Sequence, residues 1–187
     1  MEVTFLRHGI AVDRTDPLCP VDFDRPLTVE GKNKLDAALR GLKALGVRPD
    51  LVFTSPYVRC VQTATLAARA LDVPRRAIHE RQSLVPGADP RGFWDEALVN
   101  PRERLLVVGH GDTLEPIAGR ALGFPFVDAA SALPTSPLAL RVLHLKKGGA
   151  LQLVVPPDAT PAQLGLERHA TLAWLLSARL LRQLGRG

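Results

Sequence analysis

Histidine and arginine side chains follow three apolar segments of the chain, at the point where each segment ends. The first segment ends in the tripeptide Arg-His-Gly at residues 7–9, and the third ends in His110, which has a glycine on each side. The second ends in Thr-Ser-Pro at 54–56, with Arg59 three residues further on. Two guanidiniums and two imidazoles in one place would bind an anion, most naturally a phosphoryl group. These residue types therefore indicate phosphate chemistry, provided that folding brings the three segments together.

Two histidines could divide the work of a phosphoryl transfer. Neutral imidazole is a good nucleophile near pH 7, so one histidine could attack phosphorus directly. The other histidine, if protonated, could hydrogen-bond the non-bridging oxygens, while the arginines neutralise charge that spreads over the equatorial oxygens. Gly9 and Gly111 would let the backbone pass close to the ligand. This reaction needs no metal and no cofactor, and we expect none.

Alternating strands and helices would position these residues. The apolar runs 3–6, 50–55 and 105–110 are predicted to be strands, and each precedes a polar cluster and then a segment with helical features. Because these runs are continuously apolar, they indicate strands that are buried on both faces of a mostly parallel sheet. The predicted fold class is therefore α/β, with a three-layer α/β/α arrangement. In open α/β sheets ligands bind beyond the carboxyl ends of the strands, which is where the three polar clusters lie.

Capping residues set the predicted boundaries of the first two helices. The helix over 28–45 is predicted to begin after Thr28 as its N-cap and to end at Gly46. The next helix is expected to open at Pro56, with Ser55 as its N-cap, and to run to about residue 71. Both helices carry an apolar stripe that would pack on the sheet.

The second half of the chain gives weaker signals. Asp112 and Glu115 resemble a capping box for a helix after the third strand. Segments 139–145 and 150–155 alternate apolar and polar residues, which predicts a hairpin that turns at 147–149. The segments expected to be irregular are the Pro-rich ones, 74–101 and 124–137, and the first of them could cover the site.

The end of the chain is predicted to be one helix that begins at Thr160. Four leucines recur there at four-residue spacing, at positions 172, 176, 180 and 184. Such a stripe suits a contact with the core or with a second copy of the chain. Arginines at 179, 182 and 186 keep a membrane-surface helix as the alternative.

Composition and charge narrow the possible classes of protein. The 187 residues are 46% hydrophobic and 23% charged, which suits one globular domain. The net charge is +5, but no run of Lys and Arg exceeds two residues, so nucleic acid is not an expected partner. No apolar run could span a membrane, and the N-terminus lacks signal-peptide features, so we expect a cytoplasmic protein without membrane contact. Cys19 and Cys60 are expected to be free thiols. The oligomeric state stays open.

The three polar clusters resemble those of the histidine phosphatase superfamily, whose fold is phosphoglycerate-mutase-like. The matching motifs are Arg-His-Gly at 7–9, Ser-Pro-x-x-Arg-x-x-Gln-Thr-Ala at 55–64 and Gly-His-Gly at 109–111. Segment 24–31 and the short interval between the last two motifs resemble the small SixA-type phosphohistidine phosphatase branch. The resemblance covers residues 1–155, which would form the phosphatase domain, with 156–187 as a helical extension packed on the same domain.

The resemblance implies a role for each motif residue. His8 would be the nucleophile and become a phosphohistidine, with His110 as the second catalytic histidine. Arg7, Arg59 and the backbone at Gly9 would bind the phosphoryl group together with His110. The substrate would be phosphohistidine on a protein, typically a phosphotransfer domain. Phosphate, tungstate and vanadate would bind in the same place.

The acid that would protonate the leaving group has no unambiguous position in the sequence. Glu80 and Asp89 are candidates in the segment after the second motif, and Asp13 and Asp22 lie near the first. Ile10 stands where members of the family often have an acidic residue. Imidazole departs easily once it is protonated, so a missing acid is tolerable for phosphohistidine and less so for an alkyl phosphate ester.

Two other functions stay open from the sequence. The protein could be a broad-specificity phosphatase for small phosphate esters, or a non-catalytic module that binds phosphate groups. Each site residue also has a structural interpretation, because histidines can bond buried backbone, arginines can pair with carboxylates, and Glu80 and Asp89 can be ordinary loop residues. Clustered positive charge destabilises a fold, so the presence of both histidines and both arginines favours the enzyme.

Overall fold

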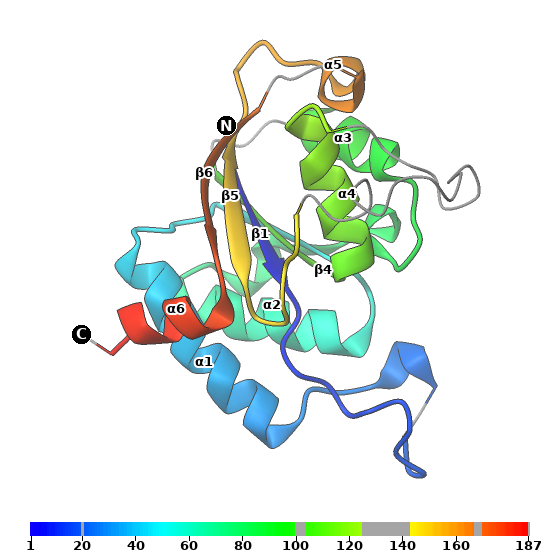
Figure 1. Ribbon diagram of the computed structural model, residues 1–187, viewed down its shortest axis with the longest axis vertical. Coiled ribbons are helices and arrows are strands. Elements are labelled where there is room, and N and C mark those ends of the chain that lie inside the picture. The colour runs from blue at the N-terminus through cyan, green and yellow to red at the C-terminus, as the bar shows by residue number, and fades with distance from the viewer. Residues whose placement is uncertain (20, 100–103, 125–142, 167–169, 187) are drawn as a thin grey trace, which may run out of the picture.

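The computed structural model of the chain describes residues 1–19, 21–99, 104–124, 143–166 and 170–186. Within these residues, six strands form one sheet in the order β3-β2-β4-β1-β5-β6 (Figure 1). The strands are β1 (Glu2–Arg7), β2 (Leu51–Thr54), β3 (Ile78–Glu80), β4 (Arg104–Gly109), β5 (Ala150–Val154) and β6 (Thr171–Leu176). The neighbours β3, β2, β4 and β1 run parallel, whereas β5 pairs antiparallel with both β1 and β6. The predicted mostly parallel sheet is confirmed.

Helices cover both faces of this sheet. They are α1 (Val29–Ala44), α2 (Val58–Ala70), α3 (Pro90–Val99), α4 (Gly111–Ala121), α5 (Pro161–Leu166) and α6 (Ala178–Leu184), with short 3-10 turns η1 (Asp22–Asp24), η2 (Arg75–Ala77) and η3 (Gln82–Leu84). Figure 1 shows α1, α2 and α6 on one side of the sheet and α3 and α4 on the other. The predicted three-layer α/β/α arrangement is therefore confirmed.

The alternation of side chains along β1 divides the core into two clusters. Phe5 packs on one face with Phe93 and Trp94 of α3, and Leu6 packs on the other with residues of α1, α2 and α6. All four of these side chains are buried. A strand that is apolar at successive positions requires cover on both faces, which the two helical layers supply.

The boundaries of α1 follow the sequence signals. The Thr28 side chain accepts a hydrogen bond from the Gly31 nitrogen at 2.9 Å, which satisfies one of the free amides of the first turn. Gly46 follows the helix with a φ of +80°, in the left-handed region where glycine has no steric penalty. The predicted N-cap and terminating glycine are both confirmed.

Two predicted caps are wrong. Helix α2 begins at Val58 with Tyr57 as its N-cap, and no side chain caps it. The Ser55 hydroxyl instead lies 3.0 Å from Nε2 of His110. The residue before α4 is His110, and the Asp112–Glu115 capping box does not form. The Glu115 carboxylate instead accepts a hydrogen bond from the Leu145 nitrogen at 2.9 Å.

The end of the chain is not one helix. It contains the short helix α5, the edge strand β6 and the helix α6. Leucines four residues apart share a face on a helix, but they also share a face on a strand, whose side chains alternate with a period of two. In β6, however, a register shift between Gln152 and Leu153 makes Leu172 pair with Leu153 and Leu176 with Ala150, which belong to the cores on opposite faces of the sheet. The four-residue leucine spacing therefore does not correspond to one shared face here. The division of the chain at residue 155 stays a prediction.

The predicted hairpin is also corrected. Its turn forms, with Gly148 at a φ of +70°, but residues 143–145 are not a strand, and 139–142 lie outside the described residues. Strand β5 therefore pairs with β1 and β6 and has no partner in 143–145.

The segment 74–101 is more regular than predicted. It contains β3 and the helix α3, which begins at Pro90, where proline is tolerated because its missing amide is not needed. The other Pro-rich segment, 124–137, lies outside the described residues except for Phe124. No helix of the described part of the chain is long and apolar enough to cross a membrane.

Candidate active site

The carboxyl ends of β2, β4 and β1 lie side by side in the sheet, so the three polar clusters meet at one edge. In the parallel register Arg7 is opposite Gly109, and the His8 nitrogen donates to the Gly109 carbonyl at 3.0 Å. The imidazole rings of His8 and His110 are 5.3 Å apart between centroids, at 64° to one another. Residues about a hundred positions apart in sequence thus form one buried pair of histidines.

A backbone carbonyl sets the protonation of His8. Its Nδ1 lies 2.7 Å from the carbonyl oxygen of Gly9, which can only accept, so Nδ1 carries the proton. The pKa of His8 is lowered to about 3, chiefly by burial and also by the nearby His110, Arg59 and Arg7, although the hydrogen bond to Gly9 acts in the opposite direction. Near pH 7 the ring is neutral, and its Nε2 holds a free lone pair.

His110 has the opposite tautomer. Its Nδ1 is 3.2 Å from Nη2 of Arg59, and because a guanidinium only donates, this nitrogen accepts. The proton is then on Nε2, which lies 3.0 Å from the Ser55 hydroxyl and 3.5 Å from the Cys60 sulfur. Burial, followed by the charge of Arg59, lowers the pKa of His110 to about 3. The second histidine is therefore neutral near pH 7, whereas the sequence interpretation considered a protonated one.

Arg59 and Arg7 approach the histidines from two elements. Arg59, in the first turn of α2, is 1% exposed, and its guanidinium carbon lies 4.8 Å from the centre of the Tyr57 ring. Arg7 donates from Nη1 to the Leu145 carbonyl at 2.7 Å. A Cβ at Gly111 would be 2.9 Å from the guanidinium carbon of Arg7, so this glycine makes room for Arg7 and not only for a ligand.

Helix α1 holds the loop after His8 in place. The Thr28 nitrogen donates to the Ile10 carbonyl at 3.0 Å. A Cβ at Gly31 would lie only 2.0 Å from that same carbonyl oxygen, so glycine is required in the first turn of α1. The nitrogen of Gly9 donates to the Thr63 hydroxyl at 3.2 Å. These contacts fix the backbone that orients the His8 ring.

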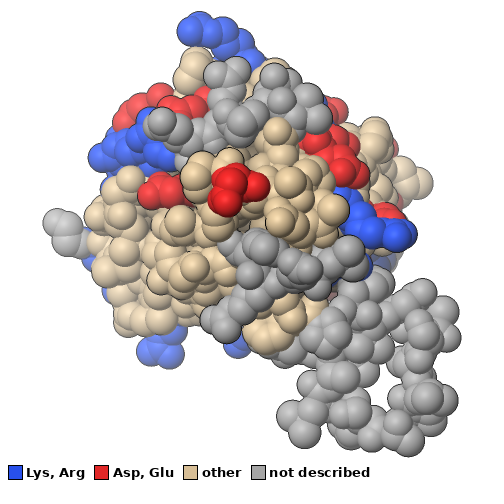
Figure 2. All heavy atoms as spheres, turned by 90° about the horizontal axis from the view of Figure 1, so that it is seen from above, with Lys and Arg blue, Asp and Glu red and all other residues tan. Residues whose placement is uncertain are grey.

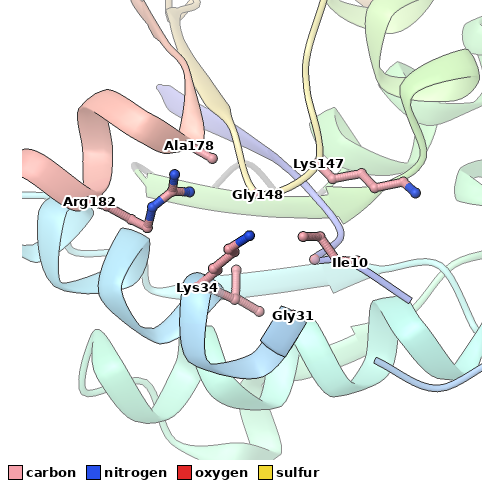
Figure 3. Close-up of a pocket in the computed structure, with 9 residues that line it drawn as sticks. Ile10, Gly31, Lys34, Lys147, Gly148, Ala178 and Arg182 are labelled. Atoms are coloured by element: carbon pink, nitrogen blue, oxygen red, sulfur yellow. The ribbon is translucent and has the colours of Figure 1, made fainter. Parts of the chain in front are cut away.

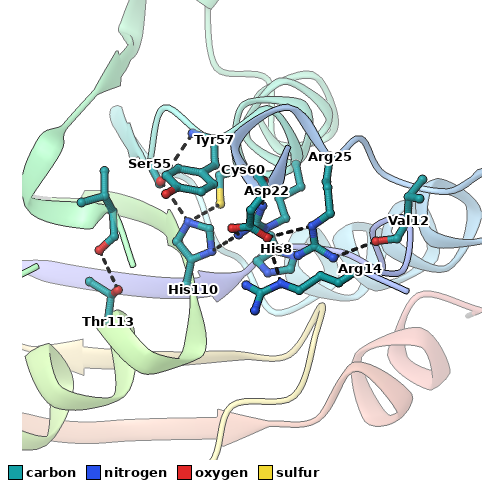
Figure 4. A network of polar contacts seen from close by, with 12 residues as sticks. His8, Val12, Arg14, Asp22, Arg25, Ser55, Tyr57, Cys60, His110 and Thr113 are labelled. Atoms are coloured by element: carbon teal, nitrogen blue, oxygen red, sulfur yellow. Dashed lines mark hydrogen bonds and ion pairs between the residues drawn. The ribbon is translucent and has the colours of Figure 1, made fainter. Parts of the chain in front are cut away.

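The carboxylate of Asp22 lies among the site arginines (Figure 4). One oxygen is 2.9 Å from Nε of Arg14 and 2.9 Å from Nε of Arg25, and the other is 3.2 Å from Nη2 of Arg59. Partial burial alone would raise the pKa of Asp22, but the guanidiniums of Arg59, Arg14 and Arg25 hold it below its ordinary value. The sequence interpretation named Asp22 only as a candidate acid and missed Arg14 and Arg25.

Positive charge continues past the histidine loop. The Lys147 ammonium is partly buried, and burial followed by the charges of Arg7 and Arg25 lowers its pKa. Beside Gly9 lies a small hollow that is open to solvent, and Figure 3 shows Lys34 and Arg182 pointing toward it from α1 and α6. The opposite end of the sheet, seen in Figure 2, carries acidic and basic side chains separated by uncharged surface.

Comparison with known proteins identifies the family. The family model of the histidine phosphatase superfamily (branch 1) matches residues 3–83, which include His8 and Arg59. An uncharacterised protein of Picosynechococcus sp. is 36% identical over 128 residues, which are 63% of this chain and 73% of that protein. The chain belongs to the histidine phosphatase superfamily.

Solved structures of phosphatases share the fold. The protein histidine phosphatase SixA complexed with tungstate has a TM-score of 0.71 at 19% identity, over 97% of this chain and 99% of that chain. A mycobacterial glucosyl-3-phosphoglycerate phosphatase in complex with VO3 has a TM-score of 0.64 at 14% identity, over 94% of this chain and 99% of that chain. The predicted phosphoglycerate-mutase-like fold is confirmed, and His110, beyond the family match, lies beside His8 in this fold.

The candidate acids Glu80 and Asp89 do not lie in contact with the two histidines of the site. Glu80 is the exposed last residue of β3, and Asp89 precedes α3. Hydrogen bonds from Arg91 lower the pKa of Asp89 to about 2, so this carboxyl group is ionised near pH 7. Within the described residues, neither carboxylate contacts His8 or His110.

Two further features limit the chemistry. Burial raises the pKa of Cys60 to about 12 despite the nearby Arg59 charge, so this residue is a thiol and not a thiolate nucleophile. No group of three or more His, Cys, Asp or Glu is placed to hold a metal ion in the part of the chain that the structure describes.

Proposed function

We propose that this protein is a metal-independent phosphatase that forms a covalent phosphohistidine at His8. The observation that carries the proposal is the neutral His8 ring, whose Nδ1 is bonded to the Gly9 carbonyl and whose Nε2 lone pair is therefore available. Arg59 and His110 lie within hydrogen-bond distance of each other beside this ring. A neutral nucleophile next to buried positive charge is suited to attack on a phosphoryl group.

The reaction would proceed in two displacements. Nε2 of His8 donates its lone pair to phosphorus, and the bond from phosphorus to the leaving group breaks with its electron pair going to the leaving atom, which takes up a proton. Water then attacks the phosphohistidine, loses a proton, and releases phosphate, which returns the lone pair to Nε2. Arg7, Arg59 and His110 would bind the phosphoryl oxygens in both steps. The Gly9 backbone, which the sequence also suggested for this role, has its amide bonded to Thr63 and its carbonyl bonded to His8.

The preferred substrate in this proposal is phosphohistidine on a phosphotransfer protein. The two carboxyl groups with the clearest partners, Asp22 and Asp89, are held ionised by arginines and are poor proton donors near pH 7. A phosphohistidine leaving group needs the least help, because its imidazole takes a proton from solvent readily. The likeness of fold to SixA supports this substrate class.

A small phosphate ester is the second candidate substrate. The likeness of fold to glucosyl-3-phosphoglycerate phosphatase supports it, since that enzyme's name describes a phosphate ester. An alkoxide leaving group has a greater need for an acid than imidazole does. This alternative therefore predicts that the catalytic rate depends on a carboxyl group with a raised pKa.

Release of inorganic phosphate tests the proposal. Phosphate would be measured from a histidine-phosphorylated phosphotransfer domain and from p-nitrophenyl phosphate, with and without a chelator. We expect chelator-insensitive activity, a higher kcat/KM on the phosphoprotein, and complete loss of activity in His8→Ala but not in His79→Ala, a histidine of β3 outside the site. Equal phosphate release by wild type and His8→Ala would contradict the catalytic assignment. A higher kcat/KM on the ester would favour the second substrate.

A further inference from the structure

The Asp22 carboxylate and its own carbonyl together occupy both ends of the Arg59 guanidinium. Nη1 of Arg59 donates to the Asp22 carbonyl at 2.6 Å, and Nη2 lies 3.2 Å from the carboxylate oxygen Oδ2. The remaining nitrogen, Nε, is buried and has no hydrogen-bond partner within the described residues. Nη2 also contacts Nδ1 of His110 at 3.2 Å. While Asp22 keeps these positions, Nη2 has no hydrogen left to form a two-point contact with a phosphoryl group together with Nη1 or Nε.

The local structure around Asp22 permits its side chain to move away from Arg59. It lies in η1, a single 3-10 turn without a side-chain cap, and its side chain is 36% exposed, whereas Arg59 is almost fully buried. One backbone hydrogen bond, from the Asp24 nitrogen to the Val21 carbonyl at 2.9 Å, closes the turn. Arg14 and Arg25 both contact the other carboxylate oxygen, so they could keep the carboxylate paired after it separates from Arg59.

We propose that Asp22 is an internal competitor for the phosphoryl site, and that the substrate displaces its carboxylate from Arg59 on binding. Two anions that require the same guanidinium repel each other and share its donors. The carboxylate thus lowers the affinity for every phosphoryl ligand and selects those that bind strongly enough to displace it. The inference rests on the proposed function, because it takes the same site to bind the phosphoryl group of the substrate.

This role differs from that of a proton donor. A donor must hold a proton near neutral pH, and a carboxylate in contact with three guanidiniums is ionised there. A competitor acts on ligand affinity, so its removal lowers KM and increases kcat/KM. A proton donor acts on the chemical step, so its removal decreases kcat/KM. The two roles therefore predict opposite signs for the same measurement.

Tungstate affinity and steady-state kinetics of Asp22→Asn test the proposal. The amide is isosteric and neutral, so it would weaken the contact with Nη2 of Arg59 without leaving space, while the backbone carbonyl of residue 22 keeps its bond to Nη1. We expect tungstate to bind about fivefold more tightly, and KM for p-nitrophenyl phosphate to fall by a similar factor with an increase in kcat/KM. The matched control is Asp24→Asn, which removes one charge from the same turn, where Asp24 is exposed. This control should keep the wild-type affinity and kinetics.

Each other outcome has a defined meaning. Equal tungstate affinity in wild type and Asp22→Asn would overturn the competitor role, as would a fall in kcat/KM, which would instead indicate a proton donor. An equal gain in Asp24→Asn would also overturn it, by showing a general charge effect. Thermal unfolding of Asp22→Asn and Asp24→Asn verifies that these two variants are folded. Asp22→Ala, which also removes the carboxylate, is measured as a second variant at this position. If wild type fails to bind tungstate at all, the proposed function itself fails.

Discussion

The groups that surround the two histidines place the ring proton on different nitrogens, on Nδ1 in His8 and on Nε2 in His110. The Gly9 carbonyl fixes the proton of His8 on Nδ1, whereas Arg59 and Ser55 fix that of His110 on Nε2. Because the Gly9 carbonyl can only accept and the Arg59 guanidinium can only donate, the pair is asymmetric before any substrate binds. One ring is left with a nucleophilic nitrogen, and the other is bound to the arginine that would hold the phosphoryl group.

The Ser55 hydroxyl provides a test of this asymmetry. Ser55→Ala would leave the buried Nε2 proton of His110 with only the more distant Cys60 sulfur, a weak acceptor, so the ring would be held less firmly in one tautomer against Arg59. We expect kcat/KM for p-nitrophenyl phosphate to fall about tenfold with little change in fold. Thr65→Ala, which removes a hydroxyl from the exposed side of α2, is the control and should retain full activity. A wild-type rate in Ser55→Ala would show that the tautomer is set by other contacts.

At the residue scale, sequence reasoning found the residues that follow strand ends. His8, Arg59 and His110 follow apolar runs that are predicted to pair in parallel. The sequence therefore also predicts that these three side chains lie close together. Asp22 and Arg25 were not recognised as a pair at the site. Their contacts depend on how an irregular loop folds, and no periodicity in the sequence encodes that.

At the scale of elements, two glycines let α6 pack directly on α1. A Cβ at Gly41 of α1 would be 1.9 Å from the Leu181 carbonyl oxygen of α6, and a Cβ at Gly185 would be 2.6 Å from the Ala37 carbonyl oxygen. Backbone therefore contacts backbone across this interface, and Leu181 is fully buried beneath it. The sequence did not reveal this docking, because the leucine spacing over 172–184 indicates one continuous helix, whereas a bulged strand and a separate helix form.

A matched pair of glycine substitutions tests this packing. Gly41→Ala must push α6 away from α1, and we expect it to lower the free energy of unfolding by roughly 1–3 kcal/mol. Gly92→Ala, in α3, places its methyl where no atom lies within 4 Å, and should raise the free energy of unfolding by about 0.5–1 kcal/mol through helix propensity. Denaturant unfolding measures both. Equal effects of the two substitutions would contradict the close contact of α1 and α6.

In the whole molecule, the parallel strands bring two buried histidines and several arginines together at their carboxyl ends. The fold class was predictable because continuously apolar strands are specific to covered parallel sheets. The regular structure within 74–101 was not, because prolines mark turns and helix starts equally well. The sequence also did not predict that β6 lies beside β5. The pairing of an edge strand depends on which strand of the sheet still has an unpaired side once the rest of the chain has folded.

The buried histidines couple stability to pH. The pKa of both His8 and His110 is lowered from 6.5 to about 3 by burial, so the unfolded chain binds more protons than the folded one between these values. Their contribution to stability is present above pH 6.5 and is lost as the pH falls toward 3. We expect the free energy of unfolding to decrease from pH 7 to pH 5, and less steeply in His110→Gln. Parallel slopes for wild type and variant would contradict neutral burial of His110.

Covalent trapping of the phosphoryl group would show directly whether His8 is the nucleophile. A single turnover of p-nitrophenyl phosphate would be quenched in alkali, where phosphohistidine survives, and the labelled peptide identified by mass spectrometry. We predict a phosphoryl group on Nε2 of His8, present with or without chelator and absent in His8→Ala. A phosphoryl group on another residue, or undiminished phosphate release by His8→Ala with no covalent species, would contradict the account.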